Sequence, residues 1–248
     1  MQNDIHITVK IKRQEGPGEK SYFQSFDCAG DGELTVADLL RSLNEQEEIK
    51  DASGEIADPV GWECSCLEKK CGACAMLING RPALACGVFL KIAASEPSKR
   101  GFRKRGEVVL EPLSRFPVVR DLMVDRSSMF EMLNKMKLWL EEKDWAGFNR
   151  DEKLEFSSGQ CLMCGCCLEV CPNFIADGGF GGAAAMNAAF KMLEQQTRDS
   201  HFHEMAAEYR KHFFNGCGQS FSCMSVCPAK LPLDEIQARA NNYAARKL

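Results

Sequence analysis

One stretch of the chain reads CLMCGCCLEVCP and carries five cysteines just before a proline. A tetrahedral metal site or a single iron–sulfur cluster takes four thiolates, so one of these five is surplus. Four of them have the x2, x2, x3 spacing of a bacterial-ferredoxin run, in which the fourth cysteine ligates the other of two clusters. In chain order they are Cys161, Cys164, Cys167 and Cys171. This register leaves Cys166 as a spare thiol.

A second run, Cys217-x5-Cys223-x3-Cys227-Pro228, supplies the missing partner ligands. Aligned on the first run, it has Ser220 where a fourth cysteine would stand. A serine hydroxyl is a poor ligand for that iron, so we expect one complete 4Fe-4S cluster and one 3Fe-4S cluster. The complete set is Cys161, Cys164, Cys167 and Cys227. The incomplete set is Cys171, Cys217 and Cys223.

A third group of cysteines lies nearer the start of the chain and has the plant-type spacing for a 2Fe-2S cluster. Its members are Cys66, Cys71, Cys74 and Cys86. The small residues Gly72 and Ala73 allow backbone N–H groups to approach the sulfurs. A zinc ribbon would repeat the C-x2-C pair twice, and this half of the chain has one such pair. Cys64 and Cys28 are interpreted as ordinary thiols.

The composition agrees with a redox protein that binds several clusters. Fourteen cysteines in 248 residues would suggest a disulfide scaffold in a small secreted protein, but here they are tightly grouped in a long chain without an export signal. A formal net charge of −4 gives no basis for nucleic-acid binding. Three clusters with different potentials form a path for single electrons, whereas nothing in the chain looks like a two-electron site. A cytosolic location is expected because the sequence has no signal-peptide core and no apolar run of about 20 residues.

The first domain, residues 1–115, is predicted to be rich in strands. Alternating apolar residues predict a strand over 5–11, and Asn79-Gly80 suits a type I′ turn between two short strands. Thr35 followed by Asp38 predicts a capping box at a helix start. Further strands are expected in 21–28 and 107–113.

The second domain, residues 116–248, is predicted to be mainly helical around the two cysteine runs. A stripe of apolar side chains predicts one helix over 127–142. Its members are Met129, Met132, Leu133, Met136 and Leu140. Further helices are expected over 183–197 and 234–246, with the glycine-rich 177–182 as a turn before the first of these.

Some remaining features favour structural roles over functional ones. The basic segment 99–105 could contact a partner or lipid head groups, but a solvated loop is the favoured interpretation. The histidines of 201–203 are expected at the surface. Trp62, Trp139 and Trp145 are interpreted as core or interface anchors.

In four segments the chain resembles the iron–sulfur subunits of succinate dehydrogenases and quinol:fumarate reductases. They are CLEKKCGACAMLINGRPALAC, LEPLSRFPVVRDLMVDRSSMF, CLMCGCCLEVCP and CGQSFSCMSVCPAKLPL. The resemblance implies an α+β protein with an N-terminal β-grasp, plant-type ferredoxin-like domain and a C-terminal all-helical, bacterial ferredoxin-like domain. It also implies a partner subunit that binds FAD and a cytochrome b-type membrane anchor with quinone and possible haem b, on the cytoplasmic side of the membrane.

Two departures from that family's pattern concern the quinone. CPNFIADGG has no tryptophan after the Cys-Pro pair, and Gly218 rather than histidine follows Cys217. These departures favour a quinone pocket within the anchor and a fumarate reductase-type complex that uses menaquinol. Two alternatives stay open: the same subunit serving a different flavoprotein, and a zinc-binding interaction module.

Overall fold

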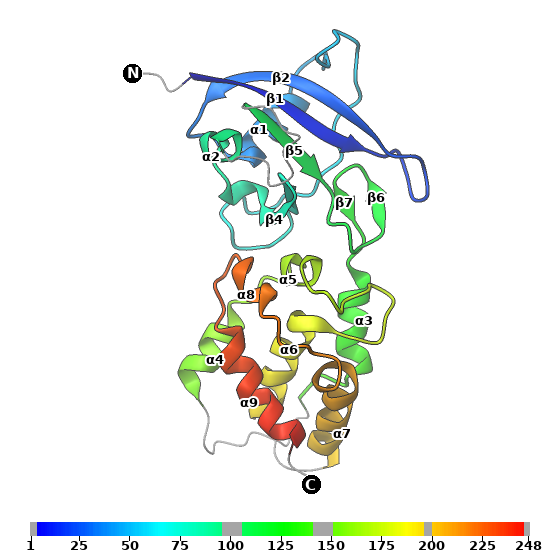
Figure 1. Cartoon of the computed structure of the whole chain (residues 1–248), viewed down its shortest axis with the longest axis vertical. Coiled ribbons are helices and arrows are strands. Elements are labelled where there is room, and N and C mark those ends of the chain that lie inside the picture. The colour runs from blue at the N-terminus through cyan, green and yellow to red at the C-terminus, as the bar shows by residue number, and fades with distance from the viewer. Residues whose placement is uncertain (1–3, 96–105, 141–150, 196–199, 246–248) are drawn as a thin grey trace. The chain divides into compact units, whose positions relative to one another are not determined.

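The computed structural model describes residues 4–95, 106–140, 151–195 and 200–245. The chain divides into two compact units, Met1–Asp125 and Arg126–Leu248. The first unit is rich in strands and the second is helical (Figure 1). No helix within the described ranges is long and apolar enough to cross a bilayer.

The first unit is built on a five-stranded mixed sheet with the strand order β2-β1-β5-β3-β4. Strand β1 pairs antiparallel with β2 and parallel with β5, while β3 pairs antiparallel with both β4 and β5. The strands are β1 (Asp4–Arg13), β2 (Tyr22–Asp31), β3 (Ala75–Ile78), β4 (Arg81–Leu84) and β5 (Glu107–Glu111).

Local sequence explains these elements. Ile7, Val9 and Ile11 alternate along β1 and are buried, which confirms the predicted strand. Asn79 and Gly80 both have positive φ, at 54° and 76°, as a type I′ turn between β3 and β4 requires.

Helix α1 (Val36–Asn44) begins at the predicted capping box. The Asp38 amide N–H donates to Thr35 Oγ1 at 3.2 Å, and the Thr35 amide N–H donates to Asp38 Oδ2 at 3.0 Å. Hydrogen bonds from Thr35 lower the pKa of Asp38. The short helices η1 (Ala85–Gly87) and α2 (Leu90–Ser95) follow β4.

A two-stranded hairpin, β6 (Val118–Arg120) and β7 (Met123–Val124), also belongs to the first unit. Asp121 at its turn is buried and accepts from Arg13 Nε at 3.0 Å and from the Gly61 amide N–H at 2.8 Å. The hairpin is thereby held to β1, so the division falls after residue 125 rather than after the predicted 115.

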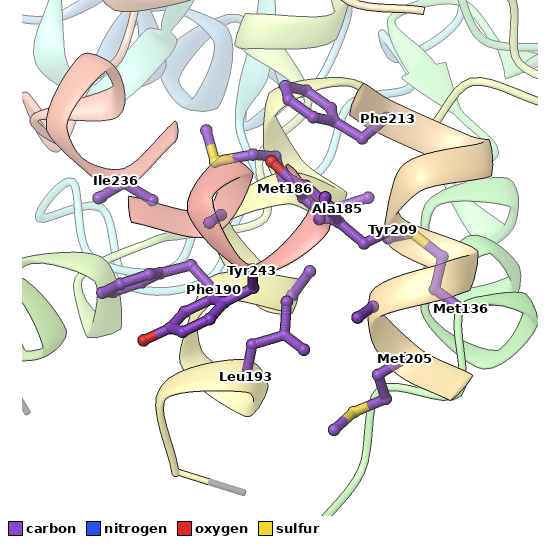
Figure 2. Packing of buried hydrophobic residues seen from close by; sticks show 14 of the residues in the cluster. Met136, Ala185, Met186, Phe190, Leu193, Met205, Tyr209, Phe213, Ile236 and Tyr243 are labelled. Carbon is purple, nitrogen blue, oxygen red and sulfur yellow. The ribbon is translucent and has the colours of Figure 1, made fainter. Parts of the chain in front are cut away.

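The second unit is a set of helices packed around α6 (Gly182–Gln195). Figure 2 shows apolar side chains of α6, α7 and α9 meeting in its core. Phe190, Tyr209 and Ile236 are fully buried there. The other helices are α3 (Ser127–Lys135), α4 (Glu152–Gly159), α5 (Cys166–Glu169), α7 (Ser200–Tyr209), the π-helix η2 (Arg210–Phe214), α8 (Ser222–Ser225) and α9 (Leu233–Ala245). The predicted helices after residues 182 and 233 are confirmed.

The helix predicted over 127–142 is too long. Helix α3 ends at Lys135, and Lys137 has a left-handed φ of 57°, which an α-helix cannot accommodate. Met129, Met132 and Met136 of the predicted stripe are buried, but Leu140 is 43% exposed.

The expectation of surface histidines is wrong for His201. This residue is buried on α7, its ring stacks on Trp139 with centroids 5.1 Å apart, and its Nε2 lies 3.1 Å from the Trp139 carbonyl oxygen. Trp139 itself is 43% exposed, and Trp62 is half-buried. Trp145 and the basic segment 99–105 lie outside the described residues.

Candidate metal centres

The first candidate centre lies in the loop that leads into β3. Cys66 Sγ accepts from the amide N–H groups of Glu68 and Lys70, both at 3.3 Å. These two hydrogen bonds lower the pKa of Cys66 to about 7, which favours the thiolate that binds metal. The amide N–H of Lys69 donates to Cys86 Sγ, also at 3.3 Å.

The loop reaches this geometry through unusual backbone conformations. Leu67, Lys69 and Gly72 all have positive φ, at 55°, 61° and 76°. Alternating left-handed and ordinary residues turns successive N–H groups toward one side, where they can meet negative charge. The sequence analysis named Gly72 and Ala73 for this purpose, and the structure adds the amide N–H groups of Glu68, Lys69 and Lys70 as donors to Cys66 and Cys86.

The four predicted ligands of this centre differ in exposure. Cys74 and Cys86 are buried with their sulfurs 3.4 Å apart, Cys66 is half-buried and Cys71 is exposed. Burial raises the pKa of Cys74 to about 12. The hairpin β3–β4 brings Cys86 back to Cys74, because the two residues flank its paired strands.

The second candidate centre is a small cavity in the helical unit, partly open to solvent, with about 30 Å³ of room for the centres of water-sized molecules. It is lined by the four thiols Cys161, Cys164, Cys167 and Cys227. Cys161 and Cys164 lie in the turn between α4 and α5, Cys167 lies on α5, and Cys227 follows α8. Leu231 and Leu233 contribute apolar walls.

The third candidate centre is a neighbouring cavity of similar size, with about 30 Å³ of room for the centres of water-sized molecules. The thiols in its lining are Cys171, Cys217 and Cys223. Ser220 lines the same cavity, as expected from its place in the second cysteine run. Ala183 at the start of α6 lines both cavities, so the two spaces share a wall.

Cys166 is set apart from its neighbours. It is fully buried and belongs to the lining of neither cavity. A hydrogen bond from its thiol lowers the pKa of Cys164 to about 7, while the same contact and burial raise the pKa of Cys166. Burial and the contact with Cys164 thus disfavour the thiolate form of Cys166.

The remaining two cysteines lie elsewhere. Cys28 is half-buried on β2, where burial raises its pKa to about 11, and Cys64 is exposed. Among the described residues, no three Cys, His, Asp or Glu side chains converge as a single metal ion requires.

Several polar groups around the helical cavities were missed by sequence reasoning. Gln237 on α9 is buried, lines the third centre and donates from Nε2 to Cys217 Sγ at 3.6 Å. Asn187 lines the second centre, and its amide oxygen accepts from Ser158 Oγ at 2.8 Å. The Cys161 amide N–H donates to the Ser158 carbonyl at 3.2 Å. The hydrogen bond between Asn187 and Ser158 therefore helps to position Cys161, the first residue of the first run.

These residues fit iron–sulfur clusters. Thiols line both helical cavities, N–H groups point at two of the sulfurs of the first centre, and the cavity of the second centre is otherwise mainly apolar. The donor set contains sulfur almost exclusively, which suits iron–sulfur chemistry rather than a hard cation.

Comparison with known proteins agrees with this arrangement. A 2Fe-2S iron-sulfur cluster binding domain matches residues 8–131, and a 4Fe-4S dicluster domain matches residues 157–231. The fold is similar to that of a chain of the Mycobacterium smegmatis Sdh1 complex in the apo form, with a TM-score of 0.66, 21% identity, and coverage of 98% of this chain and 99% of the other.

Two curated relatives match over nearly their whole length. The succinate dehydrogenase iron-sulfur subunit of Bacillus subtilis is 30% identical, over 95% of this chain and 91% of that protein. The fumarate reductase iron-sulfur subunit of Wolinella succinogenes is 27% identical, over 98% of this chain and 97% of that protein. The chain belongs to the family of succinate dehydrogenase and fumarate reductase iron–sulfur subunits.

Proposed function

We propose that this chain is the electron-transfer subunit of a succinate dehydrogenase or quinol:fumarate reductase, with no substrate turnover of its own. The observation that carries this proposal is the crossed lining of the two helical cavities. Each cavity combines thiols from both cysteine runs, as a pair of ferredoxin-type clusters requires. Family membership disfavours the zinc-binding module and gives no support to a different flavoprotein partner.

The proposed ligand sets follow the three centres. A 2Fe-2S cluster would be held in a β-grasp domain by Cys66, Cys71, Cys74 and Cys86. A 4Fe-4S cluster would be held by Cys161, Cys164, Cys167 and Cys227. A 3Fe-4S cluster would be held by Cys171, Cys217 and Cys223, with Ser220 at the position without a ligand.

When bound, the clusters would supply sites that each accept and release one electron. The chain's own residues prepare these sites. The amide N–H groups of Glu68 and Lys70 stabilise negative charge on Cys66, and Leu231 limits the access of water to the second centre. Ala183 has a small side chain between the two helical cavities, which keeps them close.

The partners follow from the family. The chain would receive or deliver electrons at an FAD-containing subunit, where succinate and fumarate interconvert, and exchange them with quinone or menaquinone in a cytochrome b-type anchor. It would lie at the cytoplasmic face of the membrane as a peripheral subunit. The names of the relatives support a place in a succinate dehydrogenase or fumarate reductase complex, and the finer assignments rest on the resemblance to that family.

Electron paramagnetic resonance (EPR) on the anaerobically purified full chain tests the cluster assignment. We expect a signal in the oxidised protein that disappears on mild reduction, from the three-iron cluster, and a two-iron signal that grows on further reduction. Ser220→Cys should add a thiolate to the third centre and replace the oxidised signal with that of a reduced four-iron cluster. A colourless protein that contains zinc would contradict the proposal.

A further inference from the structure

Helix α9 presents different side chains to the two helical cavities. Leu233, in its first turn, lines the cavity of the second centre, called here the four-thiol cavity. Gln237, one turn later, lines the cavity of the third centre, called here the three-thiol cavity. Residues four apart lie on the same face of a helix, so one face of α9 offers an apolar group to one centre and an amide to the other.

The Gln237 side chain lies deep in the unit. Its exposed fraction is 5%, and its neighbours Ile236 and Ala240 are fully buried. Its Nε2 donates to Cys217 Sγ at 3.6 Å, within the range of a hydrogen bond to sulfur. A buried amide needs a partner, and here a thiol sulfur provides one.

Other polar side chains gather around the same cavity. Asn173, Gln219 and Ser220 line it with Gln237, whereas Asn187 is the amide in the lining of the four-thiol cavity and is bonded to Ser158. Hydrogen bonds to cluster sulfurs stabilise the reduced, more negative state and therefore raise the reduction potential. Asn173 donates to the Gly216 carbonyl, whereas Gln237 donates to a cysteine sulfur, so Gln237 is the side chain in these linings whose contact favours reduction at the three-thiol centre.

We infer that Gln237 is a positioning residue whose amide donates to the Cys217 ligand and raises the reduction potential of the cluster at this centre relative to its neighbour. The inference rests on the proposed function, because it requires the three-iron cluster assigned above. It assigns to α9 a role in directing electrons, separate from the cysteines that hold the cluster.

Potentiometric titration followed by EPR tests the role of Gln237 in the cluster-loaded full chain. Gln237→Leu removes the donor while keeping a side chain of similar size. At a solution potential equal to the wild-type midpoint, the ratio of oxidised to reduced three-iron cluster should rise about tenfold, equivalent to a midpoint lowered by about 59 mV for one electron. The four-iron cluster should keep its midpoint.

Gln195→Leu is the matched control, because the Gln195 amide donates to the Lys191 carbonyl and lines neither cavity. It should leave both midpoints unchanged. A full three-iron signal with an unchanged midpoint in Gln237→Leu would overturn the inference while leaving the proposed function intact. A wild-type protein without a three-iron signal would instead overturn the cluster assignment.

A second measurement applies if Gln237→Leu loses the cluster. Glutamine side chains are labelled with ¹⁵N in the Gln219→Leu protein, because Gln219 also lines the cavity. Pulsed EPR should then detect coupling between the oxidised three-iron cluster and a side-chain amide nitrogen. The absence of this coupling would show that Gln237 makes no hydrogen bond to the cluster's ligand sphere.

Discussion

Adjacent cysteines in this chain have different environments. Cys166 and Cys167 are neighbours in sequence, yet Cys167 lines the four-thiol cavity and Cys166 is buried outside it. The ferredoxin spacing selects Cys167, since the backbone of a short helix cannot turn both side chains toward one cluster. The spare thiol instead donates to Cys164.

Substitution of the two neighbours should therefore give opposite results. Cys166→Ala should keep the iron content and the EPR signals of all three clusters, with a loss of about 1 kcal/mol in stability from the small cavity that it leaves. Cys167→Ala should lose the four-iron cluster. Iron and sulfide analysis with EPR measures both, and equal iron loss in the two variants would contradict the assignment.

At the scale of elements, the start of α6 is limited by space. Gly182 has a φ of +61°, and a Cβ atom there would lie 2.3 Å from Leu168 Cδ2 of α5. Helix α5 begins at Cys166 and carries Cys167, so the contact between these helices bears directly on the cavity. A side chain at this position would push on the element that holds a proposed ligand.

Gly182→Ala should thus destabilise the helical unit by about 3 kcal/mol, from a strained φ and from overpacking. Gly179→Ala is the control, because a Cβ atom there meets nothing within 4 Å. Loss of four-iron absorbance on heating reports the difference. Equal midpoint temperatures for both variants would contradict the prediction, because they would show that a Cβ atom at position 182 does not destabilise the helical unit.

The sequence predicted some features of the helical unit and not others. Cysteine spacing predicted which thiols share a cavity, because cluster chemistry fixes how many residues separate ligands on one loop. The contact between Gln237 and Cys217 depends on how α9 packs, which no local pattern encodes. The burial of His201 had a signal that was missed: with Met205 and Tyr209 it forms an i, i+4, i+8 stripe along the buried face of α7.

At the scale of the whole molecule, a buried ion pair decides where the first unit ends. Asp121 and Arg13 lie 108 positions apart, and Asp121 also accepts from the Gln14 amide N–H at 3.0 Å. The loss of one partner leaves the other charge buried and uncompensated, which costs far more than the loss of a surface pair. Arg120 is exposed, and its Nε lies 3.7 Å from Asp121 Oδ2. It therefore allows the loss of an exposed partner to be compared with the loss of a buried one at the same carboxylate.

Asp121→Asn should destabilise the first unit by about 3 kcal/mol, because the amide lacks the charge and one of the acceptor oxygens. Arg120→Ala should cost less than about 1 kcal/mol. Urea unfolding followed by two-iron absorbance measures both variants. Matching urea midpoints would show that the hairpin is dispensable and would favour a unit that ends near residue 115.

The mixing of the two cysteine runs has a consequence for synthesis of the chain. The first centre has all of its thiols once Cys86 has been made, whereas the four-thiol cavity lacks one wall until Cys227 emerges from the ribosome. A scaffold that donates clusters could load the first unit during translation. The helical unit has to wait for the second cysteine run, so a premature stop codon before Cys223 would remove a proposed ligand from both of its clusters at once.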